Sequence, residues 1–183
     1  LEPRLVYDNI DQPSSKLKAC MELIKTMQEN KQKVLLFSSF TSALDLIAEE
    51  CQKAGITYYM LTGSTNKEER RELVSRFQKD NTTLFLISLK AGGTGLNLTS
   101  AENVIHYDPW WNVSAQNQAT DRAYRIGQKS NVQVFNLVMK DSVEEKIIEM
   151  QKRKKELADM FVENNSGGLS QMSKEDILSL FTM

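Results

Sequence analysis

The residues best suited to chemistry in this sequence are a glutamine and two arginines spaced as one stripe of a helix. Gln118, Arg122 and Arg125 stand at positions i, i+4 and i+7, so a helix would present all three on one face. A planar guanidinium can bind phosphate oxygens through two hydrogen bonds and stabilise the charge that spreads onto them during phosphoryl transfer. For an arbitrary helix the favoured interpretation is a solvated surface whose arginines pair with Asp121, and the spacing alone does not decide between the two interpretations.

A glycine-rich segment, KAGGTGLNL, occupies residues 90–98 and could let backbone amides approach a phosphate, although it could also be a simple tight connection. It is not a nucleoside-triphosphate P-loop, because no Gly-Lys-Ser/Thr follows at the required spacing, and GSTNKEER at residues 63–70 fails the same test. The sequence therefore offers side chains for phosphate transfer without a cradle for the triphosphate and its magnesium. We expect that cradle on another domain.

The segment LTGSTN, residues 61–66, follows a strand-like run and precedes a helix-like one. Thr62, Gly63 and Ser64 offer hydroxyls and a backbone amide that can hold a phosphodiester with little positive charge. Thr65 and Glu68 have the spacing of a capping box, so we also expect Thr65 to cap the helix that follows. The two roles are compatible.

Other reactive or aromatic residues are better explained by structure than by chemistry. Trp110 and Trp111 follow a predicted strand and should be partly packed, with stacking on nucleic acid the less favoured role. His106 is the only histidine and lies within a predicted strand, without a spacing that suggests a catalytic partner. Cys20 and Cys51 fall on apolar faces of predicted helices, and with a single histidine they are too few for a zinc site or a disulfide framework. We expect no metal site and a reduced, intracellular compartment.

The composition is that of an ordinary globular protein. The chain has 183 residues, of which 40% are hydrophobic and 26% charged, with a net charge of −1. This balance excludes a bulk polyanion-binding tail, so nucleic-acid binding would need a local basic surface. No apolar run approaches the length of a membrane span, and we expect no membrane association.

The elements that must position these residues alternate between strand-like and helix-like runs. This alternation predicts an α/β fold with a parallel sheet covered by helices on both faces, and ligands at the carboxyl ends of its strands. A long, basic, amphipathic helix should follow the sheet, then a polar break and a short terminal helix. The predicted strands are 34–39, 56–61, 83–88, 103–108 and 132–138, and the predicted helices are 15–30, 42–54, 65–77, 113–126, 143–162 and 173–181.

Four tracts together resemble one family, the SWI/SNF-type ATPases of helicase superfamily two. Residues 86–112 and 116–138 look like motifs V and VI of that family. VLLFSSFTSALDLI resembles motif IV, and YMLTGSTNKEERRELVSRF resembles the segment after it. The resemblance runs in order from Lys16 to Met160, and the combination of tracts is specific where no single loop would be. Val113 and Tyr124 depart from the usual Pro and His of the family.

The resemblance implies a RecA-like three-layer sandwich with a mainly parallel sheet. Residues 1–142 would form the second helicase lobe, and residues 143–183 a C-terminal helical extension with a brace-like helix. ATP with Mg²⁺ would bind mainly to an N-terminal lobe of the same polypeptide. Arg122 and Arg125 would then act as arginine fingers positioned by Gln118. The residues implied to bind nucleotide are Gly95, Asn97, Arg122 and Arg125.

The same resemblance implies a motor that moves along the minor groove of double-stranded DNA without separating the strands. An isolated second lobe should not hydrolyse ATP, and no oligomer is required. The compact layout favours a bacterial cytoplasm over a nucleus. The implied contacts to the DNA backbone are Ser39, Thr62, Gly63, Ser88, Lys90 and Trp111.

Two alternatives stay open. The chain could be the second lobe of an RNA helicase, although residues 90–98 and 118–129 fit that interpretation poorly. It could also be a non-catalytic regulatory module that kept the fold, although the intact arginine stripe argues against lost function.

Overall fold

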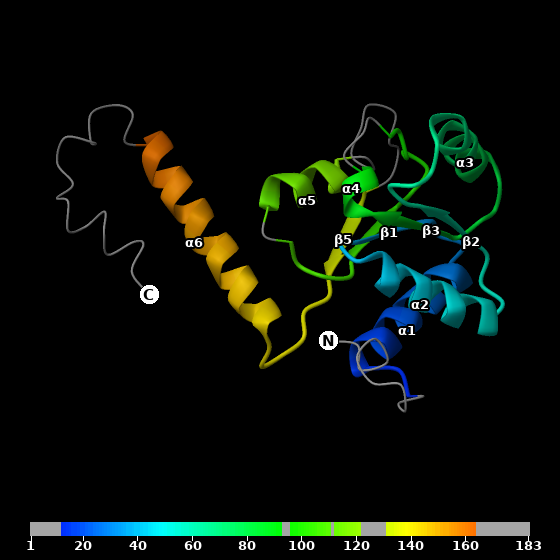
Figure 1. The fold of residues 1–183 in the computed structure, drawn as a ribbon, viewed down its shortest axis with the longest axis horizontal. Coiled ribbons are helices and arrows are strands. Elements are labelled where there is room, and N and C mark those ends of the chain that lie inside the picture. Colours follow the sequence, from blue (N-terminus) through cyan, green and yellow to red (C-terminus); the bar gives the residue numbers. More distant parts are fainter. Residues whose placement is uncertain (1–11, 93–95, 111, 122–130, 164–183) are drawn as a thin grey trace.

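Five parallel strands form the central layer of the fold, and helices cover both of its faces (Figure 1). This computed structural model describes residues 12–92, 96–110, 112–121 and 131–163. The strands lie in the order β2-β3-β1-β4-β5, and every neighbouring pair is parallel. They are β1 (Val34–Ser38), β2 (Tyr58–Leu61), β3 (Leu84–Ser88), β4 (Asn103–His106) and β5 (Gln133–Asn136).

The helices divide between the two faces of the sheet. Alternate residues of one strand point to opposite faces, so Leu36 of β1 packs on the side of α1 and α2, whereas Leu35 packs on the side of α3, α4 and α5. Figure 1 shows the same division, and the predicted three-layer α/β sandwich is confirmed. The helices are α1 (Ser15–Glu29), α2 (Thr41–Lys53), α3 (Lys67–Lys79), α4 (Leu89–Gly92), α5 (Val113–Thr120) and α6 (Val143–Glu163).

The central strands are the continuous apolar runs of the sequence. All five residues of β1 and of β3 are buried, as expected for strands covered on both faces. β5 differs from the prediction: it has four residues rather than the span 132–138, and Val134 is 39% exposed. It lies at the edge of the sheet, where only one neighbouring strand pairs with it.

Capping side chains set the starts of two helices. Ser14 caps α1 by accepting a hydrogen bond from the backbone N–H of Leu17. α3 is capped by Asn66, which accepts from the N–H of Glu69, so the expected capping by Thr65 is wrong by one residue. Asn and Thr are both good N-cap residues, and neighbouring candidates of this kind are not separable by local preference. Thr65 instead accepts a hydrogen bond from the backbone of Thr62.

The glycine-rich segment does not begin as a loop. Its first residues form the short helix α4, which follows β3 directly, and Leu89 and Ala91 are buried in the core on the α3 side. Leu96 and Leu98 belong to the same core. Apolar side chains on both sides of the glycines therefore anchor the segment against the sheet.

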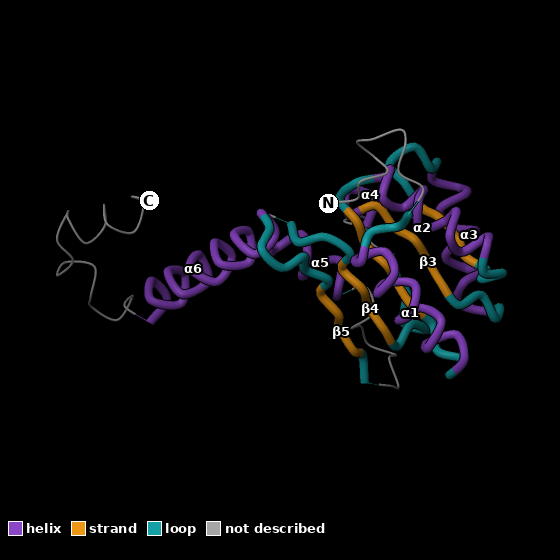
Figure 2. Tube along the Cα trace, turned by 90° about the horizontal axis from the view of Figure 1, so that it is seen from below, coloured by secondary structure: helices purple, strands orange, loops and turns teal. Residues whose placement is uncertain are grey.

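Helix α6 leaves the sheet and projects away from it (Figures 1 and 2). Its first turns contact the rest of the protein: Glu144 pairs with Lys16, Ile147 is buried, and the side chain of Gln151 donates a hydrogen bond to the backbone carbonyl of Trp110. These three positions share one face of the helix. The basic run 152–155 that follows is exposed.

Several predicted features lie outside the described residues, namely the end of the helix predicted to reach residue 126 and the terminal helix 173–181. None of the helices in the described part of the chain combines the length and apolarity that a bilayer crossing requires.

Candidate nucleic-acid interface

A crevice forms at the carboxyl edge of the sheet, where neighbouring strands send their chains to opposite faces. β1 leads into α2 on one face, whereas the adjacent β3 leads into α4 on the other. Such a divergence of connections is the usual ligand-binding place in open parallel sheets. β1 and β3 end level with each other, because Ser38 pairs with Ser88, and β2 ends one position earlier at Leu61, opposite Ile87.

This crevice holds an open pocket of about 460 Å³. Five of the six residues predicted to contact DNA line it together, although they come from three separate strand ends. The sixth, Trp111, lies outside the described residues. The full lining consists of Ser39, Phe40, Thr41, Ser42, Thr62, Gly63, Ser64, Ser88 and Lys90.

The N-terminus of α2 opens into the pocket without a side-chain cap. Its N-cap residue is Phe40, which makes no side-chain capping hydrogen bond. The first backbone N–H groups of a helix have no partner within the helix and carry a partial positive charge. Among the described residues the amides of Thr41 and Ser42 donate to no acceptor. With Lys90 on the opposite wall, these amides form a place where an anionic oxygen would be stabilised.

The wall from β2 is a hydroxyl-rich turn. Thr62 Oγ1 and Ser64 Oγ lie 2.8 Å apart and share a hydrogen bond. The backbone amide of Thr62 donates to Thr65 Oγ1 at 3.0 Å. The turn therefore presents hydroxyls and the amides that follow Thr62, rather than the amide of Thr62 itself. Gly63 is exposed, and a Cβ at this position would meet no atom within 4 Å.

A buried aspartate fixes the turn after β1. Asp108, which follows β4, accepts hydrogen bonds from the Ser38 hydroxyl and from the backbone N–H of Ser39, the latter at 3.0 Å. The Ser39 hydroxyl oxygen is buried and has no hydrogen-bond partner among the described residues. An unsatisfied buried hydroxyl typically costs about 1–3 kcal/mol, which a rotation toward a bound ligand would recover. Asp108 is thus a positioning residue that the sequence marked only by its place at a strand end.

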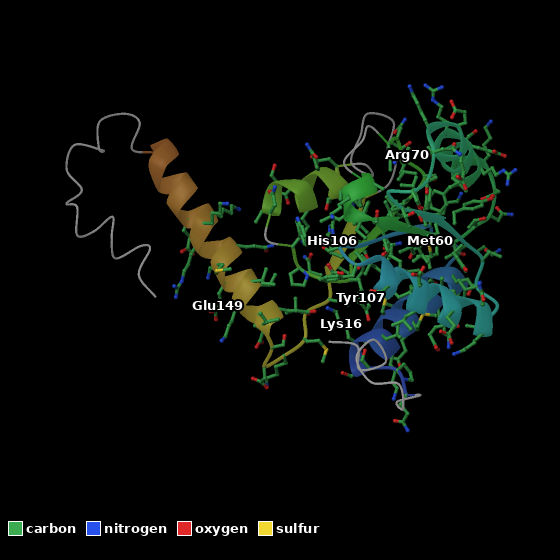
Figure 3. All side chains as sticks on the ribbon, in the orientation of Figure 1. Lys16, Met60, Arg70, His106, Tyr107 and Glu149 are labelled. Atoms are coloured by element: carbon green, nitrogen blue, oxygen red, sulfur yellow. The ribbon has the colours of Figure 1, made fainter. Side chains whose placement is uncertain are left out.

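Two side chains of α3 form hydrogen bonds with the backbone at the two ends of the glycine-rich segment. Arg70, which Figure 3 labels, donates to the carbonyl of Ala91 at 3.3 Å. Gln78 donates to the carbonyl of Asn97 at 2.7 Å and accepts from the backbone N–H of Ser100 at 3.0 Å. The helix that begins after the Thr62 turn therefore also holds the segment that contains Asn97, and it joins the two mechanically. No spacing rule in the sequence identifies Gln78.

Asn97 lies in a second pocket, not with the predicted DNA contacts. That pocket has a volume of about 690 Å³ and opens between α3 and the glycine-rich segment. Three of its lining residues, Lys67, Arg70 and Arg71, are basic. Its lining is Thr65, Lys67, Arg70, Arg71, Val74, Ser75, Leu96 and Asn97.

The nucleotide-side residues are only partly described. Gln118 is exposed on α5, while the adjacent Ala119 is buried and anchors that helix to the core. Arg122, Arg125 and Gly95 lie outside the described residues. Among the described residues no group of three or more His, Cys, Asp and Glu side chains is placed to hold a metal ion.

The remaining reactive side chains are buried. His106 is 2% exposed, stacks on Phe37 and lies 2.8 Å from the Thr120 hydroxyl. Burial lowers its pKa to about 4, so it is neutral at physiological pH. Burial likewise raises the pKa of the Cys20 thiol and raises that of Cys51 to about 12, with Glu50 adding to the latter shift. These groups are therefore poor candidates for acid–base or nucleophilic chemistry.

Comparisons with known proteins identify the family of the chain. Residues 15–127 match the family described as the helicase conserved C-terminal domain. An uncharacterized ATP-dependent helicase of Mycoplasma pneumoniae is 38% identical over 169 residues, which cover 92% of this chain and 16% of that protein. The ISWI chromatin-remodeling complex ATPase ISW1 of Saccharomyces cerevisiae is 37% identical over 186 residues, which cover 98% of this chain and 16% of that protein.

Among solved structures, the C-terminal part of the Fun30 ATPase domain superimposes with a TM-score of 0.72 at 40% identity, covering 75% of this chain and 45% of that one. The chain spans only 16% of the length of each of the two relatives.

Proposed function

Because the chain belongs to the helicase conserved C-terminal domain family, in its SWI/SNF-type branch, we propose that it is the second motor lobe of an ATP-driven translocase on double-stranded DNA. In this proposal the lobe contributes DNA contacts and arginine fingers to a site that it shares with an N-terminal lobe. Alone, it hydrolyses no ATP.

One observation carries the DNA part of the proposal: the pocket at the carboxyl edge gathers backbone-binding groups from three strand ends. Its hydroxyls, the uncapped N-terminus of α2 and the single cation Lys90 suit phosphodiester oxygens rather than base edges. Phosphate contacts position a protein on nucleic acid without reading its sequence. A motor that must step along any sequence needs contacts of this kind.

The described residues fit a shared nucleotide site. Asn97 and Gln118 are both exposed polar residues, and Gln78 fixes the position of Asn97 by donating a hydrogen bond to its backbone carbonyl. Arg122 and Arg125 would bind the phosphates of ATP, whose hydrolysis supplies the energy of the motor. A guanidinium at that point stabilises charge on the transferred phosphoryl group, which is why its loss slows the reaction so strongly.

The hydrogen bonds between α3 and the glycine-rich segment suggest how the proposed DNA site and the proposed nucleotide site are coupled. Thr62 and Gly63 precede this helix, and Asn97 is held by its side chain Gln78. A shift of the helix on DNA binding would therefore move the nucleotide-side loop by a comparable amount. This link supports DNA-stimulated rather than DNA-independent hydrolysis.

The test compares activators of ATP hydrolysis by the full-length protein. Duplex DNA should stimulate hydrolysis more than single strands or RNA of equal length. Lys90→Gln should weaken duplex binding and reduce the dependence of log K on log salt by about 1, since one phosphate contact is lost. Lys25→Gln is the matched control, because Lys25 is an exposed lysine of α1 on the other face of the sheet.

Two outcomes would overturn the proposal. Stronger activation by RNA would favour the second lobe of an RNA helicase. Absence of ATP hydrolysis with every nucleic acid would favour a non-catalytic module that kept the fold. The 183-residue chain itself should show no ATPase activity above buffer, and measurable turnover by it would contradict the shared site.

A further inference from the structure

Phe40 breaks two rules of protein stability at one position. It is the N-cap residue of α2, where Ser, Thr, Asp and Asn are preferred because their side chains satisfy the free amides of the first turn. Hydroxyl residues flank it on both sides, so a capping residue is available one position away in the sequence. The phenylalanine makes no capping hydrogen bond.

The ring of Phe40 also has little to pack against. This residue is 59% exposed, more than any other large hydrophobic residue among those described. Val134 and Val138, in and after β5, and Val143 and Met150, on α6, are the remaining exposed ones. Phe40 stands apart from these, inside a pocket whose other lining residues are polar or small. A position where local rules fail without a structural gain is the expected mark of a functional site.

We propose that Phe40 packs against the sugar of the DNA strand held in this pocket, between two phosphates that the surrounding polar groups bind. The inference rests on the proposed function, because it takes the bound polymer to be DNA. The carbon edges of deoxyribose are the apolar part of a DNA backbone. Phosphate oxygens bound by the α2 amides on one wall and by Lys90 or the Thr62–Ser64 turn on the other would bring the intervening sugar over the ring.

This contact makes Phe40 a specificity-determining residue. A 2′-hydroxyl is the group that distinguishes RNA from DNA at a given site. Against an aromatic ring that offers no hydrogen-bond partner, a ribose hydroxyl would lose its hydration without compensation. The polar groups of the pocket bind phosphate in either polymer, so the discrimination resides in the ring.

The experiment uses Phe40→Ser and Phe40→Leu in the full-length protein. Duplex DNA binding is titrated at several salt concentrations, and thermal unfolding is followed in parallel. Phe40→Ser should weaken binding about tenfold at every salt concentration without changing the slope of log K against log salt, because no ionic contact is removed. Its melting temperature should stay equal or rise, since serine is the better N-cap. Phe40→Leu should keep most of the affinity.

A second measurement addresses the sugar. Duplexes in which a short block of one strand carries ribose should bind the wild-type protein more weakly than all-DNA duplexes. With Phe40→Ser that difference should shrink. An unchanged difference would show that the ring does not read the sugar.

Failure of this inference is separable from failure of the proposed function. If the wild-type protein does not bind duplex DNA, the proposed function fails. If it binds DNA and Lys90→Gln lowers the salt slope, but Phe40→Ser binds like the wild type, only the role of Phe40 is overturned. A lower melting temperature in Phe40→Ser, together with an altered DNA-independent ATPase rate, would instead assign the ring to packing within the protein.

Discussion

The side-chain nitrogen of Lys16 lies 2.7 Å from both carboxylate oxygens of Glu144, which is 128 residues away in the sequence (Figure 3 labels Lys16). Both side chains are largely buried, at 6% and 15% exposure. The ammonium also lies 5.0 Å from the centre of the Tyr107 ring, and Glu144 accepts a further hydrogen bond from the backbone of Met139. This cluster fixes the first turn of α6 to α1 and to the end of β4.

Removing one member of this pair should destabilise the fold strongly. Lys16→Met leaves the Glu144 carboxylate buried without its partner, which we expect to cost about 3 kcal/mol in urea unfolding. The double change Lys16→Met with Glu144→Gln should recover part of that loss, because no charge remains buried. Lys53→Met is the control: that lysine pairs with Glu49 on an exposed helix surface, and its loss should change the unfolding free energy little. Equal losses at the two lysines would contradict the argument.

The buried histidine should make folding stability depend on pH. Burial depresses the pKa of His106 from 6.5 to about 4. The histidine therefore takes up a proton near pH 6.5 in the unfolded chain but stays neutral at this pH in the folded protein. The contribution of neutral His106 to the free energy of unfolding is therefore complete above pH 6.5. It is lost as the pH falls toward 4, which lowers the free energy of unfolding by up to about 3 kcal/mol. Urea unfolding of His106→Gln between these pH values should show a shallower decline than the wild type. Parallel curves would indicate that carboxylates alone account for acid sensitivity.

The sequence predicted those parts of the fold that depend on local pattern. Continuous apolar runs mark β1 and β3 because both faces of these strands are covered. Apolar residues at helical spacing mark α1 and α2. Loops after parallel strands meet at one edge of the sheet, so the alternation of strands and helices indicated that Thr62 and Lys90 would both lie at that edge. Their expected contact with DNA came from the family resemblance.

What the sequence did not predict depends on partners far along the chain. Gln78, Asp108 and Glu144 each act on residues that no spacing rule connects to them. One signal for the Lys16 pair was present: Lys16 precedes buried Cys20 by four residues, so a lysine occupies the apolar stripe of α1. A buried lysine requires an anionic partner. The exposure of Phe40 could not be predicted either, because an aromatic residue that directly follows a buried strand gives no sign of being exposed.

Alanine substitutions at two glycines should affect DNA binding and folding stability separately. Gly63 has no positive φ and no neighbouring atom that a Cβ would meet, so the free protein does not require glycine there. Close approach of a DNA backbone, in contrast, requires a residue without a side chain at this position. Gly63→Ala should leave the melting temperature unchanged and weaken duplex DNA binding about tenfold, the effect of losing roughly 1.4 kcal/mol.

Gly55 is the matched control, because its φ of +68° favours glycine whatever the surrounding space. Gly55→Ala should lower the unfolding free energy by about 1 kcal/mol and leave DNA affinity unchanged. If Gly63→Ala bound DNA normally, the turn after β2 would not approach the DNA backbone.

The arginine stripe should separate hydrolysis from binding. Arg122→Ala or Arg125→Ala in the full-length protein should reduce DNA-stimulated ATP hydrolysis by about three to five orders of magnitude, because each arginine would stabilise charge present only during phosphoryl transfer. Duplex DNA affinity should remain near the wild-type value, since the proposed DNA contacts are made by other residues. Arg76→Ala, which removes an exposed arginine of α3 paired with Glu72, should leave both properties intact.

Lysine replacements complete this test of the arginines. Arg122→Lys keeps the charge but loses the planar fork that binds two phosphate oxygens at once, so it should restore little activity. If Arg122→Lys were fully active, a point charge would suffice and bidentate binding would be excluded. If hydrolysis survived both alanine changes, Arg122 and Arg125 would belong to a solvated helix surface, and the catalytic arginine would have to come from elsewhere in the protein.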